Sequence, residues 1–109
     1  MQVEQNKNQR LFGMIGFAMR ARKLILGTPL VCAELRYGKI KLVVISKSAS
    51  EATKNKLKYK CEYYKIPAVE VDIDMQTLSN TLGKSSVIAA FGVADERFAE
   101  EIRKAVVSG

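Results

Sequence analysis

The side chains that most often carry catalysis are scarce in this sequence. It has two cysteines, Cys32 and Cys61, and no histidine. Two thiols alone cannot complete a four-ligand zinc site, and no imidazole is present to act as base for a serine or cysteine nucleophile. We therefore expect no metal site, and we expect both thiols to pack as small hydrophobic side chains.

Other patterns with a possible chemical role have simpler structural explanations. Asp72 and Asp74 alternate around Ile73 and could hold a metal ion, but capping of a helix explains Asp74. Gly13 and Gly16 come close to a dinucleotide-binding motif, yet they lie within a helical pattern and precede any strand. The sequence contains neither a phosphate-binding loop motif nor a hydrolase nucleophile motif. We expect a protein without catalytic activity and without a cofactor; a small-molecule enzyme is a remote alternative.

Positive charge dominates the chain and is unevenly distributed along it. The 109 residues include 18 Lys+Arg and 11 Asp+Glu, which gives a net charge of +7. Residues 1–65 hold 14 of the basic and 4 of the acidic side chains, whereas residues 66–109 hold 4 and 7. A surplus of this sign attracts polyanions, so we expect nucleic acid to bind at one dominant face. The alternative is a set of solvated lysines that only keeps the protein soluble.

The length and hydropathy of the chain predict one cytoplasmic domain. A chain of 109 residues that is 48% hydrophobic suits one core, so we expect a single domain over residues 1–109. No segment approaches the length of a membrane-spanning helix, and no leader pattern opens the sequence. We therefore expect a cytoplasmic monomer with reduced thiols and no membrane association.

Helical and strand patterns alternate along the chain. Apolar residues recur at helical spacing in Gln5–Met19, and the run Leu42–Ile45 is typical of a strand buried on both faces. The order αβαβαβαβα predicts a three-layer α/β/α sandwich with a central four-stranded mixed sheet. The other expected strands are Lys23–Leu26, Ala68–Val71 and Val87–Phe91.

Capping residues predict where the helices begin. Thr28 followed by Pro29 is typical of an N-cap and a first helical residue, in a helix that ends near Tyr37. Ser48 and Glu51 fit a capping box at the start of the next helix. The remaining expected caps are Asp74, for a helix that reaches Leu82, and Asp95, for a helix that reaches Val107.

Five short segments carry a resemblance to a known family. In chain order they are RKLILGT at 22–28, YGK at 37–39, KLVVIS at 41–46, CEYYKIP at 61–67 and LGK at 82–84. In this order and spacing they resemble the kink-turn-binding superfamily of ribosomal proteins, the L-seven-Ae and L-thirty-e group, particularly its small bacterial members. The resemblance covers nearly the whole chain, and it implies an α/β/α sandwich that binds sharply bent RNA without catalysis.

The resemblance also implies where the RNA binds. In that family, RNA meets the start of the helix after the first strand and the loop after the fourth helix, which correspond to residues 27–31 and 83–86. A helix start offers free amides to a phosphate, and Gly27 lets an RNA backbone approach closely. Lys23 and Lys84 are expected to neutralise phosphates from either side. The expected RNA-binding residues are Arg22, Lys23, Gly27, Thr28, Leu30, Val31, Gly83, Lys84 and Ser85.

Three positions depart from the family pattern. Kink-turn binders usually follow the Gly–Thr pair with Asn or Lys and then Glu or Gln, and they place Lys a turn later. Pro29, Leu30 and Ala33 occupy those positions here, and their side chains cannot form hydrogen bonds with base edges. The backbone half of the site is therefore present, and the base-reading half is missing. Leu30 could instead join an apolar patch that meets a protein or stacks on a base.

Four lysines of the expected third helix form two rows, Lys54/Lys58 and Lys56/Lys60. They are either solvated surface charges or a second phosphate-contacting face, and we favour solvated charges.

These patterns predict a bacterial-type protein that binds structured RNA, specifically ribosomal RNA or a ribosome-associated RNA. Pro29, Leu30 and Ala33 are expected to weaken kink-turn-like recognition. The alternative is a protein–protein interaction module on the same fold, with a ribosomal or RNA-processing protein as partner.

Overall fold

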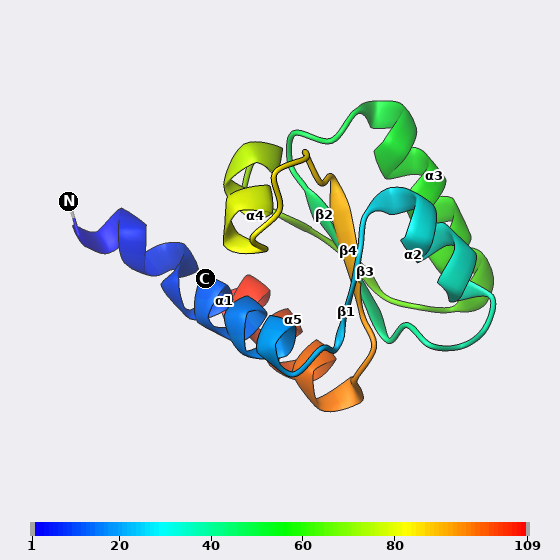
Figure 1. The fold of residues 1–109 in the computed structure, drawn as a ribbon, viewed down its shortest axis with the longest axis horizontal. Coiled ribbons are helices and arrows are strands. Elements are labelled where there is room, and N and C mark those ends of the chain that lie inside the picture. The colour runs from blue at the N-terminus through cyan, green and yellow to red at the C-terminus, as the bar shows by residue number, and fades with distance from the viewer. Residues whose placement is uncertain (1, 109) are drawn as a thin grey trace.

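Helices and strands alternate along the chain as the sequence predicts. The computed structural model describes residues 2–108, and the side chains of residues 8–107. The strands are β1 Leu24–Leu26, β2 Leu42–Ser46, β3 Ala68–Val71 and β4 Ala90–Val93. The helices are α1 Gln2–Arg20, α2 Thr28–Leu35, α3 Glu51–Tyr64, α4 Met75–Thr81 and α5 Glu96–Ser108 (Figure 1).

The strands form a mixed sheet in the order β1-β4-β2-β3. β2 and β3 are parallel neighbours joined by α3, and β4 runs antiparallel to β1 and to β2. Consequently β1, β2 and β3 all end at the edge of the sheet where β4 begins. We call this the carboxyl edge, and its strand residues are Leu26, Ser46, Val71 and Ala90. The opposite edge is the amino edge, with Leu24, Leu42, Ala68 and Val93.

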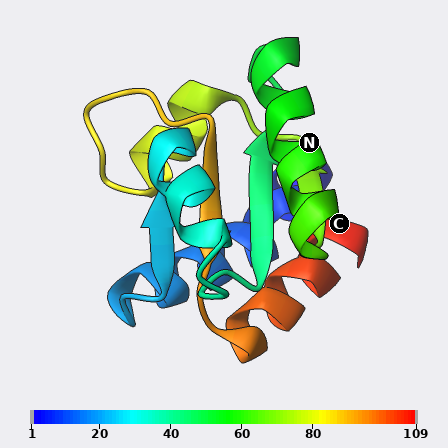
Figure 2. The same cartoon turned by 90° about the vertical axis from the view of Figure 1, so that its right-hand side faces the viewer.

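Helices cover both faces of the sheet, which confirms the three-layer α/β/α sandwich (Figures 1 and 2). On one face, the core under α1, α4 and α5 includes Ile15, Phe91 and Ile102. On the other face, α2 and α3 bury Val31 and Leu57. All residues of β2 are buried, as a strand covered on both faces requires.

The fourth strand lies further along the chain than the sequence pattern indicates. It spans Ala90–Val93 and not Val87–Phe91, and the amide of Ile88 donates to Ser79 Oγ (2.7 Å) before the strand begins. The strand continues through Gly92, which pairs with Ile25 and Val43, and Ile40 covers this position. A Cβ at Gly92 would lie 2.9 Å from Ile40 Cδ1, so the space of a side chain is already filled.

The cap predicted for α3 is also wrong. The chain first turns at Lys47–Ala49, where the Ala49 amide donates to the carbonyl of Ser46, so α3 begins only after Ser50. The side chain of Ser50 accepts the hydrogen bond from the Thr53 amide (3.1 Å). Ser48 Oγ accepts instead from the Met75 amide at the start of α4 (2.9 Å). The predicted caps Asp74 and Asp95 are confirmed.

None of the helices in the described chain is long and apolar enough to cross a membrane.

Candidate functional site

The start of α2 lies at the carboxyl edge of the sheet. The Gly27 amide donates to the carbonyl of Ala90 (3.0 Å), and the Gly27 carbonyl accepts from the Val31 amide in the first turn of the helix (3.0 Å). Gly27 has φ +94° and ψ 144°, a backbone region that is essentially open only to glycine. The cap predicted at Thr28 is therefore wrong: Gly27 makes the turn from strand to helix, and Thr28 is already helical.

No side chain caps α2. By contrast, side-chain oxygens of Ser50, Asp74 and Asp95 accept amide hydrogen bonds at the starts of α3, α4 and α5. Pro29 has no N–H, so the amides of Thr28 and Leu30 are the donors of this first turn without an acceptor in the helix. α2 therefore presents free donors and a partial positive charge at the carboxyl edge.

The connection between α4 and β4 reaches the same edge. At its end, the carbonyl of Ala89 accepts from the Ser46 amide (2.8 Å), next to the Gly27–Ala90 bond. Residues 83–87 of this connection are exposed, and Figure 2 shows the loop beside the start of α2. The structure thus places the loop that carries Gly83, Lys84 and Ser85 at the same edge of the sheet as Gly27, Thr28 and Leu30.

The other expected site residues lie elsewhere. The Lys23 carbonyl accepts from the Ala94 amide (2.8 Å) beyond the end of β4, so Lys23 and the adjacent Arg22 lie at the amino edge. β1 separates Lys23 from Gly27, and four strand steps put roughly 13 Å between them. Lys23 and Lys84 therefore do not flank one site as expected. Val31 is fully buried beneath α2, which leaves its side chain no surface for a ligand.

Leu30 on α2 and Val87 on the loop are large apolar side chains exposed at the carboxyl edge, and the sequence predicted this only for Leu30. Leu30 is 50% exposed on α2, and Val87 is 59% exposed on the loop. Sequence reasoning placed Val87 inside a strand because the segment VIAAF has a strand-like composition. The preceding pair Ser85–Ser86 was the local signal that the chain is still in a loop.

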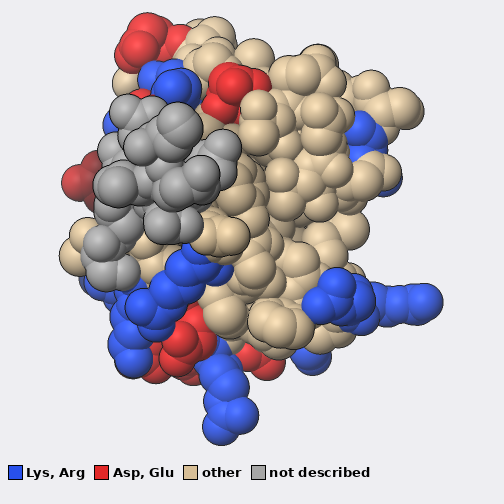
Figure 3. All heavy atoms as spheres, turned by 90° about the vertical axis from the view of Figure 1, so that its left-hand side faces the viewer, with Lys and Arg blue, Asp and Glu red and all other residues tan. Residues whose placement is uncertain are grey.

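Basic side chains gather at the amino edge and not at the candidate site. Figure 3 shows several of them toward the lower end of one face, with carboxylates among them and a broad surface of uncharged residues toward the middle. At the carboxyl edge, Lys47 Nζ pairs with Asp72 Oδ1 at 2.8 Å, so part of the positive charge there is neutralised. Arg20 is the last residue of α1. The basic residues in the segments after α1, α2 and α3 are Arg22, Lys23, Arg36, Lys39, Lys41 and Lys65.

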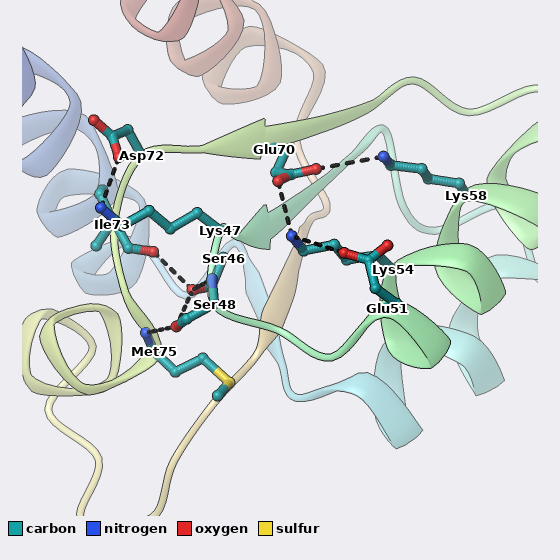
Figure 4. A network of polar contacts seen from close by, with 10 residues as sticks. All are labelled: Ser46, Lys47, Ser48, Glu51, Lys54, Lys58, Glu70, Asp72, Ile73 and Met75. Carbon is teal, nitrogen blue, oxygen red and sulfur yellow. Dashed lines mark hydrogen bonds and ion pairs between the residues drawn. The ribbon is translucent and has the colours of Figure 1, made fainter.

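An acidic residue on β3 forms ion pairs with one row of the third-helix lysines. Lys54 Nζ lies 3.0 Å from Glu70 Oε2, and Lys58 Nζ lies 3.4 Å from Glu70 Oε1 (Figure 4). The hydrogen bond from Lys54 lowers the pKa of Glu70. The Lys54 side chain is only 12% exposed, so the expectation of a freely solvated charge is wrong for this residue. Glu70 thus holds Lys54 and Lys58 close to β3.

Cys32 is half-buried and Cys61 is buried. Both are free, and burial raises the pKa of Cys61 to about 11, which keeps this thiol protonated near neutral pH. The described residues contain no group of three or more His, Cys, Asp or Glu side chains arranged to hold a metal ion.

The sequence model of the ribosomal protein L7Ae/L30e/S12e/Gadd45 family matches residues 9–103. The chain belongs to this family. The match confirms the resemblance that the ordered segments between residues 22 and 84 indicated.

Two relatives of this L7Ae/L30e/S12e/Gadd45 family member carry the same name. It is 35% identical to "RNA-binding protein YlxQ" of Enterococcus faecium over 104 residues, which cover 95% of this chain and 98% of the relative. It is 36% identical to "RNA-binding protein YlxQ" of Bacillus subtilis over 91 residues, which cover 84% and 89%.

Solved structures match the family member over nearly its whole length. A protein of unknown function from Bacillus halodurans superposes with a TM-score of 0.84 at 32% identity, over 90% of this chain and 97% of the other. The Giardia lamblia 15.5kD RNA binding protein superposes with a TM-score of 0.74 at 16% identity, over 94% and 87%. At that identity, the Giardia protein supports the fold alone.

Proposed function

We propose that this protein binds structured RNA at the carboxyl edge of its sheet and catalyses no reaction. The observation that carries the proposal is the meeting of the uncapped start of α2 with the exposed loop 83–87. A phosphate placed there accepts hydrogen bonds from the amides of Thr28 and Leu30, and Gly27 leaves room for its approach. Lys84 adds a charge from the loop. Family membership and the names of the YlxQ relatives support RNA as the ligand.

The same edge accounts for a weakened form of kink-turn recognition. Pro29, Leu30 and Ala33 are exposed at the positions where polar side chains would read base edges. Leu30 and Val87 instead offer apolar surface to an unstacked base. We therefore assign the protein a structured RNA, ribosomal or ribosome-associated, which it binds as a cytoplasmic monomer through backbone and apolar contacts.

A protein partner is the second candidate function. The exposed side chains of Leu30 and Val87 favour it, because neighbouring apolar side chains on a surface also suit a protein contact. Changing both residues to Ser separates the two functions. Loss of a bound protein with unchanged RNA affinity would favour the protein module.

The central experiment restores the missing base readers. We expect the combined variant Pro29→Asn, Leu30→Glu, Ala33→Lys to bind a kink-turn RNA more tightly than the native protein does. Each good polar contact to a base edge contributes about 1–3 kcal/mol. Dissociation constants for the kink-turn RNA and for a fully base-paired control of the same length measure the effect, and circular dichroism checks the fold.

Two outcomes contradict the proposal. If the native protein binds neither RNA, even at low salt, RNA is not its ligand. If the native protein already separates the kink-turn from the paired control as sharply as the variant does, Pro29, Leu30 and Ala33 do not weaken recognition.

A further inference from the structure

The outer side of α3 carries lysine and tyrosine at regular helical spacing. Lys56, Tyr59, Lys60 and Tyr63 stand at positions i, i+3, i+4 and i+7, so they lie along one side of the helix. We call these four residues the Lys–Tyr stripe. Tyr59 is 71% exposed and Tyr63 is 70% exposed. Aromatic rings contribute most when they are covered, so two exposed rings one turn apart indicate a contact surface.

The rings border a shallow depression of defined shape. Tyr59, Lys60, Tyr63 and Tyr64 line a space of about 270 Å³. Tyr64 packs against the core and meets the Tyr63 ring edge to face, with 4.9 Å between ring centroids and 85° between planes. This contact supports the exposed Tyr63 ring. The depression is smaller than the roughly 300–1,000 Å³ typical of small-molecule sites, so we read it as part of an open binding surface.

The lysines of the Lys–Tyr stripe and those of the row Lys54/Lys58 differ in their ion pairing. Lys54 and Lys58 are held by Glu70, as described above. In the part of the chain whose side chains are described, no carboxylate lies within ion-pair distance of Lys56 or Lys60. The positive charge of the stripe is therefore available to an anionic ligand, on the same surface as the exposed rings.

We propose that the Lys–Tyr stripe binds unpaired nucleotides of RNA. Bases stack on Tyr59 and Tyr63, and Lys56 and Lys60 neutralise the phosphates between them. The two tyrosines stand about 6 Å apart along the helix axis, further than the 3.4 Å step of a stacked strand. Successive bases must therefore be unstacked to reach both rings, which excludes duplex RNA. The inference rests on the proposed function, since one RNA would hold both elements, but it concerns a different surface.

The experiment compares two RNA probes and two matched tyrosine variants. The probes are a ten-nucleotide uridine strand and a folded kink-turn RNA without single-stranded extensions. In Tyr59→Ser/Tyr63→Ser the rings are lost, whereas Tyr59→Phe/Tyr63→Phe keeps them. We expect the Ser pair to weaken binding of the uridine strand at least about fivefold, because stacking contributes about 1 kcal/mol or more per base. The Phe pair should bind as the native protein does.

A lysine comparison tests the charge assignment in the same way. Lys56→Gln/Lys60→Gln should weaken binding of the uridine strand more than Lys54→Gln/Lys58→Gln, although each pair removes two charges. NMR signals of the Tyr59 and Tyr63 rings should shift on addition of the strand. The Lys54 side chain is largely covered, whereas Lys56, Lys58, Tyr59 and Tyr63 are exposed, so circular dichroism must verify that each variant folds.

The outcomes separate this proposal from the function proposed above. The proposal for the Lys–Tyr stripe is wrong if the native protein does not bind the uridine strand, or if the Ser pair binds it equally well. Either result holds regardless of how the kink-turn RNA binds. If the Ser pair loses the uridine strand but keeps the kink-turn RNA, the stripe stands as a second RNA surface. If the native protein binds the uridine strand through the tyrosines but not the kink-turn RNA, the site at the carboxyl edge fails and the stripe stands.

Discussion

Lys84 lies on the exposed loop beside the start of α2, whereas Lys23 lies across the sheet at the amino edge. Both side chains are basic and exposed, and both belong to segments that mark the family. Their separation makes them a matched pair, because each can be removed with the same loss of one charge.

We expect Lys84→Ala to weaken binding of a folded kink-turn RNA more than Lys23→Ala does. Lys84 alone of the two lies beside the free amides of Thr28 and Leu30. Dissociation constants at several salt concentrations measure the effect, and Lys84→Ala should reduce the salt slope by about one unit. A larger effect of Lys23→Ala would place the RNA at the amino edge.

Asp74 links the stability of α4 to pH. The Thr77 amide donates to Asp74 Oδ1 at 2.8 Å, and this hydrogen bond lowers the pKa of the carboxyl below its ordinary value near 3.8. The folded protein then binds fewer protons here than the unfolded chain does. The contribution of Asp74 to stability is therefore present above the pKa of the unfolded chain and is lost as pH falls through the pKa of the folded protein.

We expect Asp74→Asn to make the free energy of unfolding less dependent on pH in acid. Asparagine still offers an oxygen to the cap, but it cannot titrate. Urea unfolding of both proteins between about pH 5 and pH 2 measures the free energy of unfolding, which should fall less steeply in the variant. Equal slopes would show that the Asp74 carboxylate is not preferentially stabilised in the fold.

At the residue scale, the sequence predicts that the first strand ends at Gly27, because a glycine between a strand pattern and a helix pattern is typical of a turn. The expected RNA-binding roles of Gly27 and Thr28 come from the family resemblance and stay predictions. Val87 was missed because its exposure depends on where β4 begins, which no local pattern determines. Lys23 was assigned to the site because nearness to Gly27 in sequence hides the length of β1.

At the scale of elements, the limits of β4 depend on its pairing with β1 and β2, which lie far away along the chain. Periodicity predicts that strands and helices alternate, because that signal is local. It does not predict the limits of β4, because this pairing is not local. The start of α3 was missed for a similar reason, since Ser48 bonds to α4.

A second long-range contact restricts one position of β4. Ile40 precedes β2 and covers Gly92 in β4, where a Cβ would meet Ile40 Cδ1 at 2.9 Å and Ile40 Cγ1 at 3.2 Å.

We expect Gly92→Ala to destabilise the protein by about 1–3 kcal/mol, since it inserts a methyl group into a filled space. Ile40→Val removes Cδ1 and should cost about 0.5–1.5 kcal/mol alone. In the double variant the added methyl finds more room, so the two costs should sum to more than the measured total. Chemical denaturation of the four proteins measures this. Strictly additive costs would mean that Ile40 does not restrict position 92.

At the scale of the whole molecule, the fold distributes charge in a way that the net value of +7 conceals. The chain order predicted one dominant basic face. In the structure, basic residues gather at the amino edge, Glu70 forms ion pairs with Lys54 and Lys58, and Lys47 pairs with Asp72. Charge counted along a sequence does not show which side chains the sheet brings to the same edge.

A shallow salt dependence follows for RNA held at the carboxyl edge. Each neutralised phosphate contributes about 0.9 to the slope of log affinity against log salt, and this edge offers Lys84, whereas Lys47 is paired with Asp72. We expect a slope of about −1 for a folded kink-turn RNA without single-stranded extensions, measured between low and physiological salt. A slope of about −5 or steeper would show that the amino edge also contacts the RNA.

The uncapped first turn of α2 limits how this sequence can evolve. A capping side chain typically adds about 1 kcal/mol to the stability of a helix, so random substitution tends to find such caps wherever they fit. At position 27 they do not fit, because a φ of +94° strains any residue with a side chain. A substitution at position 27 therefore cannot stabilise α2 by capping its free amides. The amides of Thr28 and Leu30 remain free donors even as other surface residues are substituted.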